Sequence, residues 1–227
     1  MPVRAAKPGS RTWCCPLLLL VLVGLTCHTT GGPVQMVSKI GATQTPPASG
    51  GGDAYAPVIS PDGRYVLFAS AANNLTLNNS NSPLPLVLPA RLNVFLRDRT
   101  MQTTTLVSVN LAATSGGNGD SWPSALSSNA QYALFESSAT DLTLDATNNV
   151  TQVFLRDLIA GTNLLVSVNT NGVGGNGASR YSVMTPDGRY VAFASDASDL
   201  VADDTNGLTD VTIKPSSSRA TPVMWPT

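Results

Sequence analysis

The side chains that most often carry out acid–base and nucleophilic chemistry are almost absent from the body of this chain. The only histidine is His28, the three cysteines are Cys14, Cys15 and Cys27, and all four lie within the segment 1–32. Glu136 is the only glutamate. Without His or Cys, the rest of the chain cannot form a Ser-His-Asp triad, a Cys-His pair or a His-ligated zinc site. We therefore expect that the protein is not an enzyme.

Aspartates are the remaining candidates for acid–base chemistry. The relevant positions are Asp141, Asp145, Asp199, Asp203, Asp204 and Asp210. A hydrolase that uses two catalytic carboxylates would have to take both from this set. We expect instead that these aspartates form turns and strand-end hydrogen bonds, because they recur at matching places in a sequence repeat.

An oxygen-rich subset of these residues also allows a calcium site. It consists of Asp199, Asp203, Asp204, Asn206 and Asp210, and calcium takes oxygen ligands. The spacing does not match the D-x-D/N-x-D/N-G loop, and the corresponding stretch 141–152 keeps only two carboxylates. A hairpin turn built on Asp and Asn side chains is favoured, with calcium as the alternative. No other cofactor is expected.

One block of sequence occurs three times and organises the chain. It reads SPDGRYVLFAS at 60–70, SSNAQYALFES at 127–137 and TPDGRYVAFAS at 185–195. A second landmark reads NVFLRD at 93–98, QVFLRD at 152–157 and, more weakly, DVTIK at 210–214. The spacing of this landmark gives a period of roughly 59 residues, and a fixed period of this size indicates a repeat architecture.

Each landmark has the composition of a short strand. The apolar runs 65–69 and 191–194 are bounded by turn residues and are typical of strands covered on both faces. Within Ser-Pro-Asp-Gly, proline pre-sets φ, aspartate bonds the local backbone and glycine supplies a positive φ. A short run precedes each turn, at 57–60, 124–127 and 182–185, and a further landmark reads VSVN at 107–110 and 166–169. Together these features predict four strands per repeat. We expect the following aromatic side chains to pack between repeats: Tyr65, Phe68, Trp122, Tyr132, Phe135, Tyr181, Tyr190 and Phe193.

Two further recurring features have structural interpretations. The pairs Arg97-Asp98 and Arg156-Asp157 predict an ion pair between neighbouring repeats, worth at most about 1 kcal/mol if exposed. The sequence GGNG at 116–119 and 174–177 predicts flexible connectors, since it lacks the strand-to-helix context of a phosphate-binding loop.

Four short antiparallel strands per repeat are typical of a β-propeller blade, so the sequence predicts an all-β fold. The block at 60–70, with its downstream Asp-Thr-Asn-Gly loop and Val-Phe-Leu-Arg-Asp strand, resembles the TolB-type, WD40-like β-propeller repeat over about residues 35–214. That resemblance implies propeller blades in a protein of the bacterial envelope or a secreted protein. It also implies the roles seen in that family, which are envelope scaffolds and the non-catalytic propellers of peptidases. The second copy departs from the motif, with Asn129-Ala130 in place of Asp-Gly.

The expected organisation is a leader at 1–32, repeats at 33–214 (approximately 35–98, 104–157 and 163–214) and an irregular Ser/Pro-rich tail at 215–227. Counted from Met36, each repeat begins with an outer strand, as in propellers whose chain starts in the middle of a blade. Three blades are too few for a closed ring, which has about four to eight. Truncation of a longer gene product is the favoured interpretation. The alternatives are an open arc and self-association through exposed terminal blades.

The segment 1–32 has the layout of a signal peptide. Arg4, Lys7 and Arg11 precede the apolar run 17–25, and small and polar residues follow. The run is shorter than the roughly 20 residues that a membrane span needs. We therefore expect an exported protein, in the periplasm, the cell envelope or outside the cell. A lipid anchor at Cys27 is the weaker alternative, because the residues before it do not fit the usual pattern.

The remaining chain has 10 basic and 14 acidic residues, a net charge of −4. No basic patch indicates a nucleic-acid partner. Two functions fit. The first is an exported, non-catalytic propeller that binds a protein, peptide or glycan, or acts as a scaffold. The second is the accessory propeller of an exported hydrolase whose catalytic domain is absent here.

Overall fold

The computed structural model describes residues 34–40, 49–72, 74–76, 91–146 and 148–216. Within these ranges the chain forms eleven strands and no helix, which confirms the all-β prediction. The chain divides into two compact units, Met1–Val34 and Gln35–Thr227, and every strand belongs to the second. The predicted leader, with Cys27, and most of the predicted tail lie outside the described residues.

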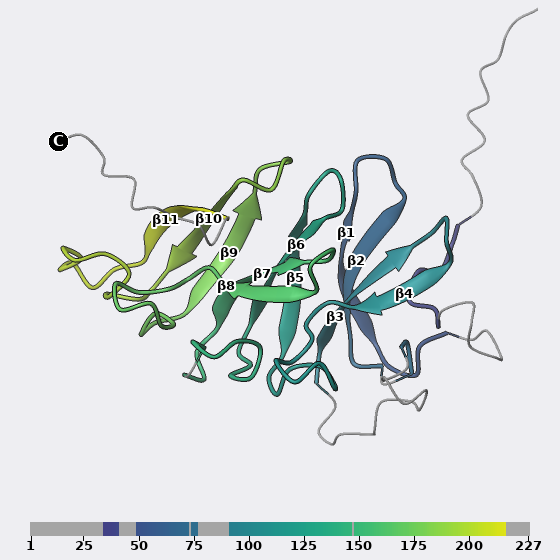
Figure 1. Cartoon of the computed structure of the whole chain (residues 1–227), viewed down its shortest axis with the longest axis horizontal. Helices are drawn as coiled ribbons and strands as arrows, with labels where there is room; N and C mark the ends of the chain where they lie inside the picture. The colour runs from purple at the N-terminus through teal and green to yellow at the C-terminus, as the bar shows by residue number, and fades with distance from the viewer. Residues whose placement is uncertain (1–33, 41–48, 73, 77–90, 147, 217–227) are drawn as a thin grey trace, which may run out of the picture. The chain divides into compact units, whose positions relative to one another are not determined.

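The strands form three antiparallel sheets that follow one another along the chain (Figure 1). The first contains β1 (Ala54–Ile59), β2 (Tyr65–Ser70), β3 (Asn93–Asp98) and β4 (Thr103–Leu106) in that spatial order. The second contains β5 (Ser121–Leu126), β6 (Tyr132–Ser137), β7 (Gln152–Asp157) and β8 (Thr162–Leu165). The third contains β9 (Ser179–Met184), β10 (Tyr190–Ser195) and β11 (Asp210–Pro215). These meanders are blades of the propeller type, and they form no closed barrel.

The sheets are offset by one strand from the sequence repeats. The first strand of each later repeat, β4 and then β8, pairs with the last strand of the preceding repeat. The third sheet therefore shows three strands among the described residues rather than the four expected. Residues 217–227, which come after this sheet in the chain, are not described.

The predicted turn chemistry forms between the first and second strand of every sheet. In the first sheet, Ser60 Oγ lies 2.5 Å from Asp62 Oδ1 and accepts a bond from Tyr65 N at 2.9 Å. Gly63 supplies a φ of +68°. In the second sheet the equivalent residue is Ala130, held at φ +52°. A residue with a Cβ is strained in this left-handed region.

Apolar side chains fill the space between consecutive sheets. One cluster joins Leu67 and Leu96 of the first sheet to Phe135 and Phe154 of the second. A second cluster joins the second sheet to Phe193 of the third. The predicted aromatic core is confirmed for the phenylalanines: Phe68, Phe135 and Phe193 are all buried. Among the tyrosines, Tyr65 and Tyr132 are only partly buried, and Tyr190 is exposed.

The glycine-rich segments at the start of each sheet are closely packed. These segments are GGG at 50–52, GNG at 117–119 and GNG at 175–177, and the middle residue of each donates its backbone N–H to a side chain in the loop after the second strand. The three bonds are Gly51 to Asn74 Oδ1 at 2.7 Å, Asn118 to Asp141 Oδ1 at 2.8 Å and Asn176 to Asp199 Oδ1 at 2.9 Å. A Cβ on the following glycine would lie only 2.4–2.6 Å from backbone atoms of that loop, as at Gly52, Gly119 and Gly177. The prediction of flexible connectors is therefore wrong. Glycine is required here because two backbones approach each other.

Candidate functional site

The structure does not gather the proposed calcium ligands into one site. Asp199 accepts bonds from Asn176 N and from Asn169 Nδ2, and Asn206 accepts one from Leu208 N in a local turn. Asp210 begins β11, opposite Ser195. Asp204 Oδ1 is buried without a hydrogen-bond partner in the described structure.

Nowhere in the described ranges do three or more His, Cys, Asp or Glu side chains come close enough to hold a metal ion. Asn206 has the turn role predicted for it, whereas Asp199 accepts its bonds from residues 23 and 30 positions earlier in the chain. Asp141 likewise bonds the glycine-rich segment of its own sheet. Asp145 is exposed, and its carbonyl accepts a bond from Gly174 N.

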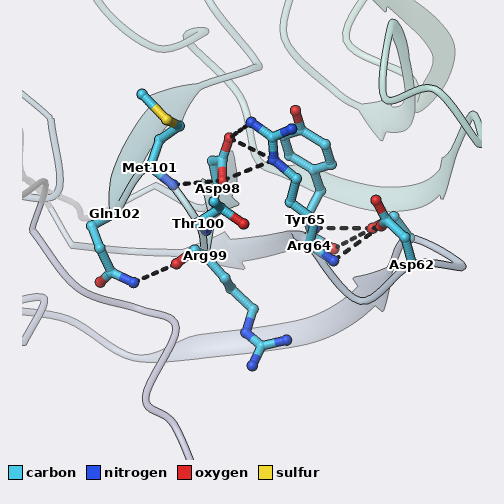
Figure 2. A network of polar contacts seen from close by, with 9 residues as sticks. Asp62, Arg64, Tyr65, Asp98, Arg99, Thr100, Met101 and Gln102 are labelled. Atoms are coloured by element: carbon cyan, nitrogen blue, oxygen red, sulfur yellow. Dashed lines mark hydrogen bonds and ion pairs between the residues drawn. The ribbon is translucent and has the colours of Figure 1, made fainter.

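Among the residues that the structure describes, the recurring Arg-Asp pairs form no ion pair between repeats, so that prediction is wrong. Figure 2 shows the network around the first pair: Asp98 binds Arg64 of the same sheet, with Arg64 Nη2 2.7 Å from Asp98 Oδ2. Arg97 instead donates to the carbonyl and side chain of Gln102. In the second sheet, Arg156 donates to Asn163 Oδ1 at 3.2 Å.

Asp98 holds the hairpin between β3 and β4 as well as Arg64. Its Oδ1 accepts bonds from Thr100 N at 2.8 Å and Met101 N at 2.9 Å (Figure 2). The guanidinium of Arg64, the largest influence, and these backbone donors hold the pKa of the Asp98 carboxyl below its usual range. Both recurring pairs are therefore structural.

Large exposed side chains gather instead on the first strand of each sheet. Tyr55 on β1, Trp122 on β5 and Tyr181 on β9 are 47%, 41% and 82% exposed. Arg180, beside Tyr181, is also exposed. We call these four residues the first-strand surface. β5 contacts both β1 and β9, so the three strands are neighbours within this unit.

Tyr55, Trp122 and Arg180 occupy one position in the repeat. They lie opposite Ala69, Glu136 and Ala194 in their sheets. In the second and third sheets, the residue before this position is a serine whose hydroxyl contacts a serine on the neighbouring strand. Ser121 Oγ bonds Ser137 Oγ at 2.8 Å, and Ser179 Oγ lies 2.9 Å from Ser195 Oγ. All four serines are buried. The side chains of Trp122 and Arg180 therefore extend from strand positions that these serine contacts hold in place.

A β-bulge follows this position and turns the next residue outward. The pairing register of β9 with β10 shifts between Ala192 and Ala194, and Tyr181 has a φ of +55°. Ala56 in β1 has a φ of +50° at the equivalent bulge. A bulge bends its strand and re-aims side chains, and it often lies beside functional sites. This conformation explains why Tyr181 points into solvent.

Two sheets cooperate at the first-strand surface. The rings of Tyr55 and Trp122 are 6.1 Å apart between centroids and tilted by 53°. Tyr55 Oη donates to Asp53 at 3.2 Å, and this bond raises the pKa of the tyrosine hydroxyl. The surface thus combines aromatic faces with the basic side chain of Arg180, and the acidic Asp53 lies beside it.

Glu136, the residue opposite Trp122 on the neighbouring strand, joins the second sheet to the third. Its Oε1 accepts a bond from Ser182 N at 2.8 Å and lies 2.9 Å from Ser182 Oγ. Ser182 Oγ lies 2.8 Å from Ser124 Oγ on β5. The equivalent positions in the other sheets are alanines. The single glutamate therefore fixes β9 beside β5, and with it the spacing of Trp122 and Tyr181.

The sequence pointed to Trp122 and Tyr181, but the role predicted for them holds only for Trp122, whose ring contacts Tyr55 of the neighbouring sheet. They were expected to pack between repeats, and Tyr181 is almost fully exposed instead. They are also one position apart in the repeat, because Arg180 is the counterpart of Trp122. The available signal was variation between the copies of the repeat: Tyr, Trp and Arg replace one another here, whereas Phe68, Phe135 and Phe193 are the same residue in all three copies.

No protein-family model matches the sequence, and no curated protein is detectably similar to it. Among solved structures, it is similar to one described as "putative TolB from Agrobacterium tumefaciens", with a TM-score of 0.35 and 17% sequence identity. The matched region covers 66% of this chain and about half, 56%, of that one. Similarity at this level does not establish a shared family or ligand. Separately, the described part of the chain has no helix that is long and apolar enough to span a membrane.

Proposed function

We propose that this protein is an exported, non-catalytic binding module that takes an extended peptide or protein segment on its first-strand surface. The observation that carries the proposal is the exposure of Tyr55, Trp122, Arg180 and Tyr181 on three neighbouring strands. Tyr, Trp and Arg are the residue types enriched at the energetic centres of protein interfaces. Side chains needed only for folding would have no reason to gather here.

The strands that carry these residues also suit an extended ligand. β1, β5 and β9 are each the edge strand of their sheet. An edge strand has backbone N–H and C=O groups on one side without a partner in the ladder, and an extended peptide can add to it. Main-chain bonds would then supply affinity, while the aromatic side chains supply selectivity.

Export is supported by the signal-peptide layout of the segment 1–32. The absence of catalysis is supported by the sequence 33–227, which has no His or Cys. The aspartates that could substitute are held in turns and glycine-rich packing contacts, as Asp141 and Asp199 are.

A selection experiment tests the proposal without knowledge of the natural ligand. The full chain is immobilised and used to select binders from a phage-displayed random peptide library. The enriched peptides are then titrated calorimetrically. We expect Trp122→Ala to weaken binding by about 30-fold, which corresponds to the roughly 2 kcal/mol of an interface hot spot. Leu208→Ala, an exposed loop substitution away from these strands, is the matched control and should change the affinity less than twofold.

Three outcomes would count against the proposal. Failure to enrich any peptide with folded protein would contradict it, as would equal binding by the wild type and Trp122→Ala. An oligosaccharide array is screened in parallel. Binding to glycans that depends on Trp122, without peptide enrichment, would show the surface to be correct and the ligand class to be wrong.

A further inference from the structure

The outward face of the third sheet is apolar and exposed. Val183 on β9, Val211 on β11 and Ile213 on β11 are 59%, 82% and 64% exposed. Ala192 of β10 lies opposite both Val183 and Ile213, and Ala194 lies opposite Val211. Directly paired residues share a face of a sheet, so these five residues form one continuous patch. We call them the third-sheet face.

The same positions are covered in the two other sheets. Leu67 and Leu96 of the first sheet correspond to Ala192 and Ile213, and they are buried against the second sheet. Leu134 and Leu155 of the second sheet are buried against the third. In both cases an adjoining sheet covers the face. The third-sheet face is thus built for contact with another sheet.

The opposite end of the stack is already closed. Phe68 and Phe95, on the first-sheet face that no described sheet precedes, stack at 5.9 Å and are only 2% and 1% exposed. The glycine-rich segment covers part of this side, because a Cβ on Gly50 would lie 2.9 Å from Leu75 Cδ2. Terminal repeats commonly carry such a covering, and the third sheet shows none over these apolar side chains among the described residues.

The outer face of the first sheet is buried and that of the third sheet is exposed, and this difference limits how two copies can associate. A head-to-tail contact would need the first-sheet face that is already buried. The third-sheet face of a second copy is exposed, however, and because it is equally apolar it can pack against the third-sheet face of the first copy. A contact in which both partners use the same surface closes on itself with twofold symmetry, which is the commonest arrangement of protein dimers.

We propose that two copies of this chain associate through their third-sheet faces, packed sheet on sheet. Three strands about 4.8 Å apart and six residues long, at about 3.3 Å per residue, give a face of about 14 by 20 Å. A flat face of this size, about 280 Å² per copy, is below the roughly 800 Å² per partner of a standard specific interface, so the dimer is weak, forms only in the upper part of the micromolar range and dissociates on dilution. Arg180, which belongs to the first-strand surface, is paired with Ala194 and therefore lies at the edge of the third-sheet face.

Sedimentation velocity of the full chain from about 1 to 100 µM tests the proposal. We expect the weight-average mass to rise from one copy towards two. Ile213→Lys and Val211→Lys should each raise the dimer dissociation constant at least tenfold, because a lysine would be placed in an apolar contact. Both residues are mostly exposed in the single chain, so these variants should still fold. Ile159→Lys, which is 79% exposed in the β7–β8 hairpin, is the matched control and should leave the dimer intact.

A monomer at 100 µM would overturn the proposal, since the face would then need no second copy. A dimer unaffected by Ile213→Lys and Val211→Lys would also overturn it, as would open-ended assembly beyond two copies. Trp122→Ala should leave the dimer unchanged. The dimer and the peptide-binding proposal can therefore fail separately.

Discussion

The close packing of the glycine-rich segments predicts opposite results for two adjacent substitutions. In Gly52→Ala the new Cβ would lie 2.6 Å from Ala72 N and 2.7 Å from Ala71 C. Backbone atoms cannot move aside as a flexible side chain does, and overpacking of this kind costs about 1–3 kcal/mol. In Gly51→Ala the nearest atom is Asn74 Oδ1 at 3.4 Å, an ordinary contact. Neither glycine has a positive φ, so backbone strain does not separate the two variants.

Urea unfolding of the two variants and the wild type, followed by far-UV circular dichroism, measures the difference. We expect Gly52→Ala to lower the free energy of unfolding by about 3 kcal/mol and Gly51→Ala to change it by less than about 0.5 kcal/mol. The repeat supplies a second trial, because Gly119→Ala places its Cβ 2.5 Å from Ala139 N. Equal stability of Gly52→Ala and Gly51→Ala would refute the close backbone approach.

Three further predictions concern stability and follow from single contacts. Ala130→Gly should raise the free energy of unfolding by about 0.5–1 kcal/mol in urea unfolding, because it relieves a Cβ held at φ +52°. Asp98 has a lowered pKa in the folded protein through Arg64, so its contribution is present at neutral pH and is lost as the pH falls below about 4. Thermal unfolding from pH 7 to pH 2 should therefore show a smaller acid-induced decline for Asp98→Asn than for the wild type, and an equal decline would exclude this role. Glu136→Ala should destabilise the protein by about 1–3 kcal/mol, since it leaves Ser182 N without its acceptor, and Glu136→Gln should restore part of the loss in the same assay.

Local chemistry was predictable from the sequence, and contacts between distant segments were not. The Ser-Pro-Asp-Gly turn formed as expected because its bonds join residues within five positions, such as Ser60 and Tyr65. The strands were recognisable because apolar runs recur between such turns. The roles of Gly52 and Gly119 were missed, since only the packing of two separate loops shows that a side chain has no room there.

The candidate site shows the same division. The residues Trp122 and Tyr181 stood out from the sequence, but composition could not show which face of a strand they occupy. The bulge at Tyr181 decides this, because a one-residue shift in register moves a side chain to the other face. The offset of β4 and β8 into the preceding sheet agrees with a chain that starts in the middle of a blade, but the predicted repeat boundaries had assigned both strands to the following repeat.

The fluorescence of Trp122 during ligand titration is the most direct test of the first-strand surface as a binding site. Trp13 and Trp225 are replaced by phenylalanine in the full chain, so that Trp122 is the only tryptophan left. A peptide enriched from the phage library is then added until binding is saturated. Because the Trp122 side chain is 41% exposed in the free protein, its burial by the peptide should shift the emission maximum to shorter wavelength, with a midpoint that matches the calorimetric dissociation constant. Saturated binding without any change in this emission would place the ligand elsewhere and contradict the proposed site.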